Sequence, residues 1–528
     1  MHPIDLAIFL IYIVGLLLFG YFFFRTHQSG DDYFVGGRNM SSWHVGLSVV
    51  ATDVGGGFSI GLGGLGFVMG LSGSWMLFTG LIGAWLAAVL LIPKVKRNPY
   101  FDKAYTFPEL FSHYYSPTVA LVAAVISAIG YAGFTSSQLL AGAKLASGTF
   151  PEFAVDDALL VMGIVAVVYT VMGGLKAVIY TDTIQWILLL TGLIFVGIPV
   201  AWIEIGGAEA IRSTLSPELL SLTNIRWQQI VNWSITIIPI WFVGMTLYQR
   251  IYACNDEKTA KRAWYMAGLF EWPVMAFMGV LLGLFARVAA DQGMFIDFGV
   301  ASSVDADPET GLPMLLRTVL PVGLLGVMMA SYFSAILSTA DSCLMASSGT
   351  IVSDIAGRFR PIDPDSKRFI RFSQLVTLLV GVIAIVLASL TPNVLQLMLA
   401  SYAFMVSGLF VPVVGALFWR RSTPAGAMAA MLSGGSVTLI LQFLSVNLDV
   451  QLPLGLDPNV FGMSVSALAF ATVSMRTYQP ENEKRESDAQ SGNESHSDRN
   501  RSDTRQANAH QSDAQSGNKN GSHQSDTR

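Results

Sequence analysis

The chain has 528 residues, of which 52% are hydrophobic and only 13% are charged, and its formal net charge is −5. Soluble proteins carry about 25% charged residues, so this composition excludes a soluble enzyme and predicts a protein embedded in a lipid bilayer. The negative net charge gives no electrostatic basis for binding nucleic acid. Two cysteines are too few for a secreted disulfide scaffold.

Long apolar segments run through most of the chain, and about 20 such residues suffice for one helix to cross a bilayer. The segment at 4–24 has no basic residues before it and is too long for a signal peptide, so we expect it to remain as a membrane span. In all, the sequence predicts about 13 transmembrane helices, near residues 4–24, 42–70, 73–95, 118–147, 157–174, 178–204, 230–252, 262–289, 318–353, 370–391, 394–418, 425–446 and 458–475.

The density of basic residues alternates between successive connections. The connections after odd-numbered spans hold 18 Lys and Arg residues, whereas those on the opposite side hold about five. Because cytoplasmic loops are enriched in Lys and Arg, we expect the N-terminus outside and the C-terminus in the cytoplasm. The chain is therefore predicted to be a multi-pass protein of a bacterial-type inner membrane.

The second span is interrupted by three consecutive glycines, Gly55–Gly57, beside an ionisable residue, Asp53. Each glycine weakens a helix by about 1 kcal/mol relative to alanine, and a carboxylate is costly in hydrocarbon. An unwound segment is tolerated at this depth where it lines a polar cavity, and its freed carbonyls can bind a cation. Close helix packing through small residues is the alternative. The glycines and the carboxylate together favour a binding site.

Another feature runs from Gly173 and Gly174 through Lys176 to Asp182. The pattern predicts a Gly-Gly turn that leads into the sixth span. Asp182 has two interpretations here, as an N-terminal helix cap or as an ion ligand, and its spacing does not separate them.

The ninth span carries a polar cluster in which Ala335, Ser338, Asp341 and Ser342 fall on one face of a helix. Hydroxyl and carboxylate oxygens suit a small hard cation, whereas transition metals favour Cys or His. Serine side chains that bond back to their own helix are the alternative, but they leave the embedded Asp341 unexplained.

After Tyr478 the chain contains no Val, Ile, Leu, Met, Phe, Trp or Tyr. The segment Ser487–Asn493 recurs as Ser512–Asn518. A polar, repetitive segment without core-forming residues is predicted to be disordered, so residues 479–528 are expected to form a cytoplasmic tail.

Together these segments resemble the sodium:solute symporter family, over most of residues 1–475. The resemblance is strongest at Asp31–Arg38, the Gly-Gly and Tyr180–Gln185 segment, Gln249-Arg250 and Ser338–Ser342. Val54–Phe58 and Ser338–Ser342 are most similar to the choline-transporter branch, whereas Asp53 matches the proline symporters.

The resemblance implies an all-α polytopic fold of two inverted five-helix repeats with broken helices, plus peripheral helices. Its parts would be an N-terminal helix and cytoplasmic loop at 1–40, a first repeat (spans 2–6) at 41–205, a second repeat (spans 7–11) at 206–421, two C-terminal helices at 422–478 and the disordered cytoplasmic tail at 479–528.

The resemblance also implies where sodium binds. The main site would use the carbonyls of Ala51, Val54 and Ala335 with the side chains of Ser338 and Thr339. Some family members bind a second sodium, whose ligands would fall on Asp182, Ser338, Asp341 and Ser342. Asp341 stands where that second site often has a hydroxyl, so the number of sodium ions stays open.

The solute would lie beside the broken helices. An aromatic side chain with a nearby carboxylate suits a cation or zwitterion, such as an amino acid or quaternary amine, although aromatic residues in membrane helices commonly serve packing alone. The candidate substrate-binding residues are Asp53, Phe58, Tyr131, Gln138, Trp241 and Met245.

These features predict sodium-coupled symport of a small organic solute by alternating access, with sodium as the coupling ion and no enzymatic activity. Sodium could bias solute binding only through a difference in affinity between conformations. The alternatives are a non-coupled sensor or channel-like protein on the same fold, and a symporter of a sugar or carboxylate.

Overall fold

The computed structural model describes residues 2–26, 38, 40–150, 152–359, 363 and 366–479. Within these ranges it does not describe the side chains at 23–26, 53, 54, 57, 58, 173–181 and 184. Residues 31–37 of the first family motif, the predicted tail at 480–528 and the side chains of Asp53 and Phe58 therefore lie outside the described part. The chain divides into two compact units, Met1–Ser474 and Met475–Arg528, and the architecture below is that of the first.

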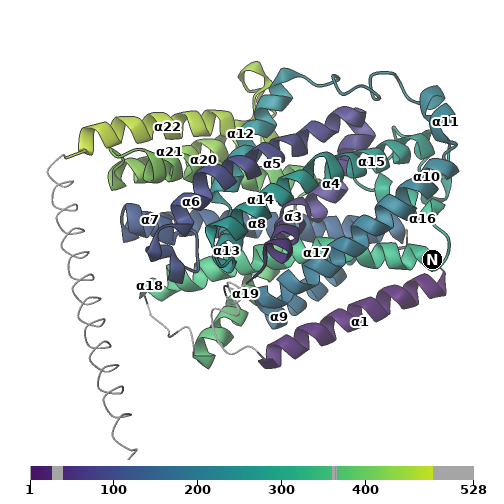
Figure 1. Cartoon of the computed structure of the whole chain (residues 1–528). Helices are drawn as coiled ribbons and strands as arrows, with labels where there is room; N and C mark the ends of the chain where they lie inside the picture. The colour runs from purple at the N-terminus through teal and green to yellow at the C-terminus, as the bar shows by residue number, and fades with distance from the viewer. Residues whose placement is uncertain are drawn as a thin grey trace, which may run out of the picture. The chain divides into compact units, whose positions relative to one another are not determined.

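Helices account for most of the described residues, which contain no β-strand beyond one isolated bridge between Met40 and Cys254 (Figure 1). The first half of the chain forms α1 (Pro3–Thr26), α3 (Ser42–Val54), α4 (Gly56–Met69), α5 (Trp75–Leu86), α6 (Ile92–Lys96), α7 (Glu109–Tyr114), α8 (Pro117–Thr149), α9 (Val155–Gly192), α10 (Ile198–Glu204) and α11 (Gly207–Thr214). The second half forms α12 (Trp227–Val243), α13 (Met245–Ala253), α14 (Glu257–Leu269), α15 (Ala276–Asp291), α16 (Gly311–Val319), α17 (Leu324–Thr350), α18 (Gly357–Phe359), α19 (Lys367–Ser389), α20 (Val394–Phe418), α21 (Pro424–Asn447) and α22 (Pro458–Thr477).

Several helices begin where the sequence supplies a capping residue followed by proline. Ser116 Oγ accepts a hydrogen bond from Val119 N (3.3 Å) at the start of α8, and Pro117 follows it. Thr423 Oγ1 accepts one from Gly426 N (3.1 Å) at the start of α21. Such caps satisfy amide groups that have no partner within the helix, so local sequence defines these boundaries.

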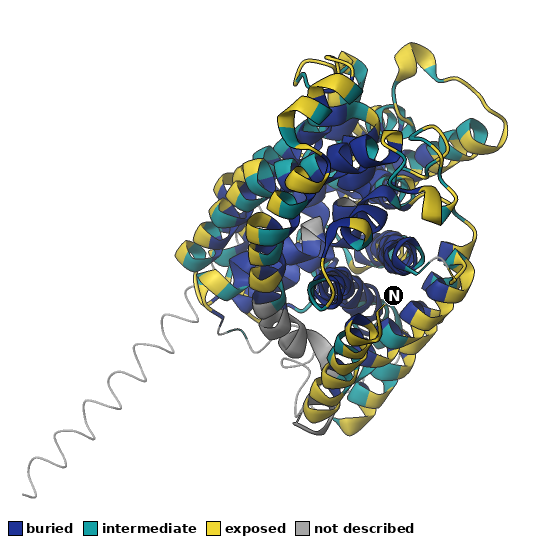
Figure 2. Ribbon diagram, turned by 90° about the vertical axis from the view of Figure 1, so that its right-hand side faces the viewer, coloured by how far each residue is buried: buried dark blue, intermediate teal, exposed yellow. Residues whose placement is uncertain are grey.

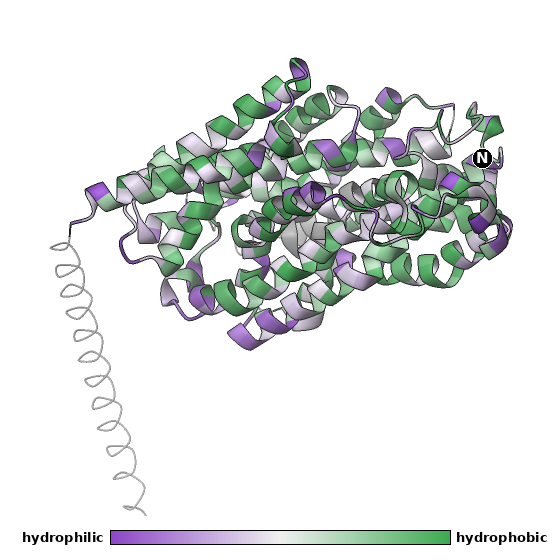
Figure 3. Cartoon of the chain, turned by 90° about the horizontal axis from the view of Figure 1, so that it is seen from above, coloured by the Kyte–Doolittle hydropathy of each residue, from purple (hydrophilic) through white to green (hydrophobic). Residues whose placement is uncertain are grey.

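The outward faces of the peripheral helices are apolar. Ile11, Phe195 and Ile203 are more than 70% exposed, at 72%, 74% and 71%. Figure 2 shows exposed residues along the outer helices around a buried interior, and Figure 3 shows hydrophobic residues on the same helices. Exposed apolar surface of this extent is expected where lipid, rather than water, is the solvent. The predicted all-α polytopic membrane protein is confirmed.

The number of spans differs from the prediction. The described residues contain 11 helices long and apolar enough to cross a membrane, or up to 12 if the bent pair α12–α13 counts as one. The predicted count of about 13 is not confirmed. The difference lies at residues 59–96, where α4 and α5 follow one another through a 3-10 turn at Gly70–Ser74 and count as one stretch, although Gly70 has φ 67° and ends α4. The preceding helix α3 has only 13 residues.

Two membrane helices are broken in the middle. Gly55 separates α3 from α4 with φ −25° and ψ −157°, where the sequence predicted an interruption. Gly244 separates α12 from α13, and the two halves are bent by 42°. Each break frees backbone groups that a continuous helix would bond internally.

Helix α17 packs directly against the first break. A Cβ atom on Gly55 would collide with the side chain of Thr339, and one on Gly56 would collide with Ile336. Glycine at both positions therefore permits the backbone of the broken helix to approach α17 at contact distance. This approach brings the freed backbone of one helix against the hydroxyl-bearing face of another.

Candidate functional site

The first group of oxygen atoms lies between the α3–α4 break and α17. Thr339 Oγ1 donates a hydrogen bond to Ala51 O at 2.7 Å and lies 3.4 Å from Ala335 O. All three residues are at least 99% buried. The structure thus brings together three of the residues expected to bind the main sodium ion.

The two other expected ligands lie beside this group. Ser338 Oγ is buried and makes no hydrogen bond of normal geometry among the described residues, although it lies next to the carboxylate of Asp182. Val54 is the last residue of α3, where helix carbonyls lose their intrahelical partners. Hydroxyl and carbonyl oxygens in this arrangement are the ligand type that a small hard cation prefers.

A second group, the inner charge cluster, consists of Ser48, Asp182, Arg250 and Ser342 and is completely buried. Ser48 Oγ donates to Asp182 Oδ2 at 2.6 Å and accepts from Arg250 Nε and Nη2 at 3.2 and 3.1 Å. Arg250 Nη2 also donates to Ser342 Oγ at 2.7 Å and lies 3.8 Å from Asp182 Oδ2. The guanidinium group therefore links α13 to α3, α9 and α17.

The expected ligands of the second sodium bond to different partners. Asp182 and Ser342 face the guanidinium group of Arg250, whereas Asp341 Oδ1 accepts a hydrogen bond from Thr170 Oγ1 on α9. Asp182 lies in the interior of α9, which runs without interruption from Val155 to Gly192. The interpretation of Asp182 as a helix cap is therefore wrong, and so is the predicted turn at Gly173 and Gly174.

Two of the candidate solute-binding residues meet at the second break. Tyr131 Oη lies 3.0 Å from Thr246 Oγ1 and accepts a hydrogen bond from Thr246 N at 3.2 Å. Met245 is the first residue of α13, and its Sδ accepts a hydrogen bond from Phe107 N at 3.1 Å. Tyr131 thereby binds a backbone amide that the break leaves free.

The other candidates lie elsewhere. Trp241 packs against Gly83 of α5 and contacts Trp264 of α14 with 6.5 Å between ring centroids, so its ring belongs to the packed core. Gln138 is buried on α8, seven residues beyond Tyr131, which places both on one face of that helix. Asp53 and Phe58 belong to α3 and α4, and their side chains are not described.

Sequence reasoning missed an outer charge cluster formed by Lys144, Asp307 and Glu309. Lys144 Nζ lies 2.8 Å from Asp307 Oδ2 and 2.7 Å from Glu309 Oε2, and only 4% of the lysine side chain is exposed. The Glu309 carboxylate also accepts hydrogen bonds from the amides of Val394 and Leu395, both at 3.0 Å. This cluster joins α8 to the segment before α16 and to the N-terminus of α20. Lys144 lies more than 160 residues before its two partners, so no local sequence pattern indicates the cluster.

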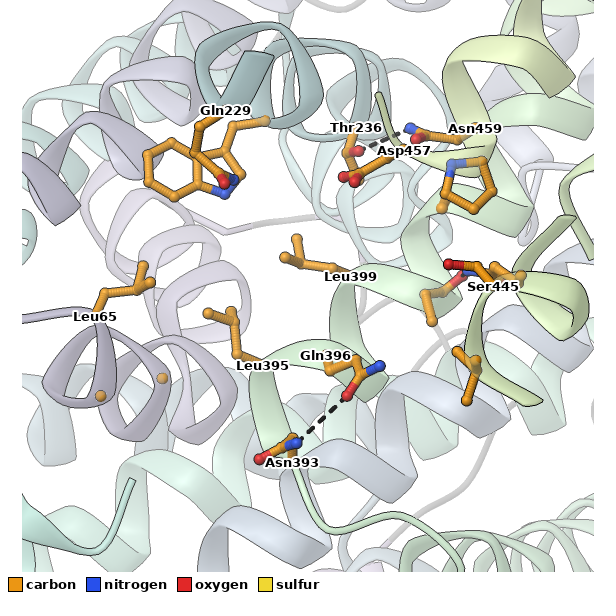
Figure 4. Close-up of a pocket in the computed structure, with 18 of the residues that line it drawn as sticks. Leu65, Gln229, Thr236, Asn393, Leu395, Gln396, Leu399, Ser445, Asp457 and Asn459 are labelled. Atoms are coloured by element: carbon orange, nitrogen blue, oxygen red, sulfur yellow. Dashed lines mark hydrogen bonds between the residues drawn. The ribbon is translucent and has the colours of Figure 1, made fainter. Parts of the chain in front are cut away.

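A cavity of about 870 Å³ lies between α4, α12, α20 and α21, and no sequence pattern predicted it (Figure 4). Its polar residues come from segments far apart in the sequence, so they form no single motif. Its lining includes Gly61, Gly64, Trp233, Thr236, Ser445 and Asp457. Tyr131, Gln138, Trp241 and Met245 are not among its lining residues.

Two mid-membrane helix breaks beside buried oxygen clusters are the architecture of a secondary transporter. The family model described as the sodium:solute symporter family matches residues 33–434, so this chain belongs to that family. The resemblance found in the sequence motifs is confirmed.

Similar proteins agree with this assignment. The osmoregulated proline transporter OpuE of Bacillus subtilis is 28% identical over 485 residues, which cover 89% of this chain and 94% of that protein. The sodium/proline symporter of Escherichia coli is 27% identical over 448 residues, covering 82% and 87%. A Na⁺-coupled sialic acid symporter in a substrate-bound outward-open state has the same fold, with a TM-score of 0.72, 21% identity and coverage of 90% and 98%.

The chain is therefore a multi-pass membrane transporter and not an enzyme. It performs sodium-coupled symport, and sodium and a small-molecule solute are its transported partners.

Proposed function

We propose that the solute is a small zwitterion or cation, such as an amino acid or a quaternary amine. Curated relatives that share 27–28% of their residues with this chain carry names that specify proline. Tyr131 and Met245 at the second break, with Gln138 on the same helix face as Tyr131, would contact the solute. Asp53 and Phe58 at the first break would complete the site, and Trp241 would support it from the packed core.

The main sodium site is proposed at Ala51, Val54, Ala335, Ser338 and Thr339. The observation that carries this proposal is the Thr339 hydroxyl, which donates to Ala51 O on α3 and lies 3.4 Å from Ala335 O on its own helix, α17. Sodium bound there would interact with α3 and α17 at once. It would therefore bind well only while the two helices are close, and this difference in affinity is what couples the ion to a conformation.

A second sodium at Asp182, Asp341 and Ser342 would compete with Arg250. The guanidinium group already lies between Asp182 and Ser342, and two positive charges cannot share a buried site of this size without a large electrostatic cost. We therefore propose one sodium ion per solute while Arg250 keeps this position. Sodium dependence of uptake with a Hill coefficient near 1 is expected, and a coefficient near 2 would contradict it.

The proposed organisation has two inverted repeats at 41–205 and 206–421, flanked by helices at 1–40 and 422–478. In support, each proposed repeat has a break in its first membrane helix, at Gly55 and at Gly244.

For the orientation, we propose an outside N-terminus, a cytoplasmic C-terminus and a bacterial inner membrane. Figure 1 draws the N-terminus beside α16, while α6 and α18, which contain Lys94, Lys96 and Arg358, lie toward the opposite end.

The test is uptake into proteoliposomes that contain the purified chain and an inward sodium gradient. L-proline, choline and glycine betaine represent the proposed class, and glucose and pantothenate represent sugars and carboxylates. We expect sodium-driven accumulation of a member of the first group alone. Accumulation of glucose or pantothenate only would overturn the solute class. Solute flux that ignores the sodium gradient would favour the channel-like alternative.

A further inference from the structure

The cavity between α4, α12, α20 and α21 lies on the side of the protein that is proposed to face outward. Its walls include the start of α12, the start of α20 and the end of α21, together with the segments at 307–309 and 457–459. In Figure 4, Leu395 and Leu399 lie near the middle of the cavity, Leu65 lies at one side, and Thr236, Asp457 and Asn459 gather at the other. A volume of about 870 Å³ is ample for a solute the size of an amino acid.

The cavity continues toward the first helix break. Gly61 and Gly64 of α4 line it, and Gly61 lies six residues beyond Gly55, or about 9 Å along the helix. At this level Gly61 faces Leu395, and Gly64 faces the Cγ of Glu309 at 3.2 Å from where a Cβ would stand. A solute in the cavity would thus rest on the helix whose other end forms the proposed sodium site.

The ionisable side chains that line the cavity are all acidic. Its described lining contains three carboxylates, Asp307, Glu309 and Asp457, and no Lys, Arg or His. Lys144 pairs with the first two from behind the wall. Asp457 differs, because among the described residues no side chain or amide donates to its carboxylate. The basic residue Arg226 lines an adjoining pocket of about 570 Å³ that shares Val68, Met69 and Gln229.

Asp457 is held in a defined position. Its backbone amide donates to Asn232 Oδ1 at 3.0 Å, and Asn459 Nδ2 donates to Thr236 Oγ1 at 2.8 Å. The side chain of Asp457 is exposed, and partial desolvation by the surrounding protein raises the pKa of its carboxyl group above the usual value. Trp233 lines the cavity but is only 3% exposed, so it serves mainly as part of the wall. A cation that enters the cavity can reach the Asp457 carboxylate, to which no described group donates.

We propose that this cavity is an outer waiting site for a solute with an ammonium group, in which Asp457 provides the opposite charge. A zwitterion would turn its ammonium group to Asp457 and its carboxylate toward the pocket that holds Arg226. The acidic lining would raise the local concentration of ammonium-bearing solutes at the outer side, because a negatively charged cleft attracts cations. The identity of the waiting solute rests on the proposed function, whereas the charge preference of the cavity does not.

The charge preference can be measured without transport. A single cysteine placed at Ser445, which lines the cavity, is treated with a cationic and an anionic thiosulfonate reagent of similar size. Wild-type protein serves as the background, since Cys254 and Cys343 are 1% and 0% exposed. The cationic reagent is expected to react at least about threefold faster, and Asp457→Asn should remove most of this difference.

One control variant and one alternative labelling position accompany this experiment. Asp297→Asn removes an exposed acidic residue that does not line the cavity, so it should leave the rate ratio unchanged. Gln396→Cys offers a second labelling position on α20 if Ser445→Cys fails to fold. Equal rates for the two reagents, or a preference that survives Asp457→Asn, would overturn the proposal.

A solute arm then tests occupancy, with L-proline as the probe and acetate at equal concentration as the anionic control. L-proline is expected to slow labelling of Ser445→Cys at least about threefold, and this protection should disappear in Asp457→Asn. If tetramethylammonium protects and L-proline does not, the waiting site is supported for cations and the zwitterion assignment fails. No protection by either compound overturns the waiting site even where sodium-driven uptake itself is found.

Discussion

The inner and outer charge clusters use the same chemistry in different ways. In the inner cluster, Arg250 and Asp182 lie 3.8 Å apart and share the hydroxyl of Ser48, and neither side chain is exposed. In the outer cluster, Lys144 contacts two carboxylates directly at 2.7–2.8 Å, and the side chain of Asp307 is 43% exposed. The ion pair of the inner cluster is fully buried and its charged groups interact mainly through hydroxyl groups. The ion pairs of the outer cluster are in direct contact and partly exposed to solvent.

This difference indicates separate roles in the transport cycle. The inner cluster joins both broken helices, through α3 and α13, to α9 and α17, and its bonds pass through hydroxyl groups that can exchange partners. The outer cluster fixes the N-terminus of α20, because Glu309 accepts the amides of Val394 and Leu395. We therefore expect the inner cluster to rearrange when the protein opens inward and the outer cluster to anchor the cavity wall.

The largest effect is expected from Arg250→Gln, which leaves the carboxylate of Asp182 buried without a positive partner. Breaking one side of a buried ion pair costs about 3–5 kcal/mol, so the variant should unfold at a clearly lower temperature and lose uptake. Adding Asp182→Asn should restore much of the thermal stability, because the double variant contains no unpaired charge. Wild-type stability in the single variant would contradict the arrangement of the inner cluster.

A smaller effect is expected from Lys144→Gln. Asp307 is accessible to water, and Glu309 keeps two backbone hydrogen bonds, so the loss should be about 1–3 kcal/mol. Thermal unfolding of the purified chain measures it, with Lys261→Gln as the matched control on a more exposed pair with Glu257. A loss equal to that of Arg250→Gln would reverse the comparison of the two clusters.

The smallest effect is expected from removal of the polar tail. Truncation after Tyr478 removes no residue of either cluster and no residue that can build a core, so uptake should stay within about a factor of two. Truncation after Asn447 is the contrasting variant, since it also deletes α22, where Phe470 packs against Trp419. Loss of uptake on removal of the tail alone would assign it a role in transport.

The sequence predicted the features that depend on local pattern. Apolar length defined the membrane helices, and Gly55 beside Asp53 located the first break. Contacts between distant segments could not be predicted in this way. Ser48 and Arg250 are 202 residues apart, and nothing in either segment indicates that they meet. Trp241 illustrates the same limit, because the rotation of α12 about its axis turned its ring toward α5 and α14.

The central claim is that sodium binds between the α3–α4 break and α17, and Thr339→Ala tests it most directly. Sodium dependence of uptake is compared in this variant, in Thr339→Ser and in Ser331→Ala, a buried residue of α17 whose hydroxyl, within the described part of the chain, bonds to its own helix alone at Val327 O. Thr339→Ala should raise the sodium concentration for half-maximal uptake at least about tenfold, or ~1.4 kcal/mol, while the other two stay near wild type. Sodium dependence in Thr339→Ala equal to that of wild type would contradict the proposed site.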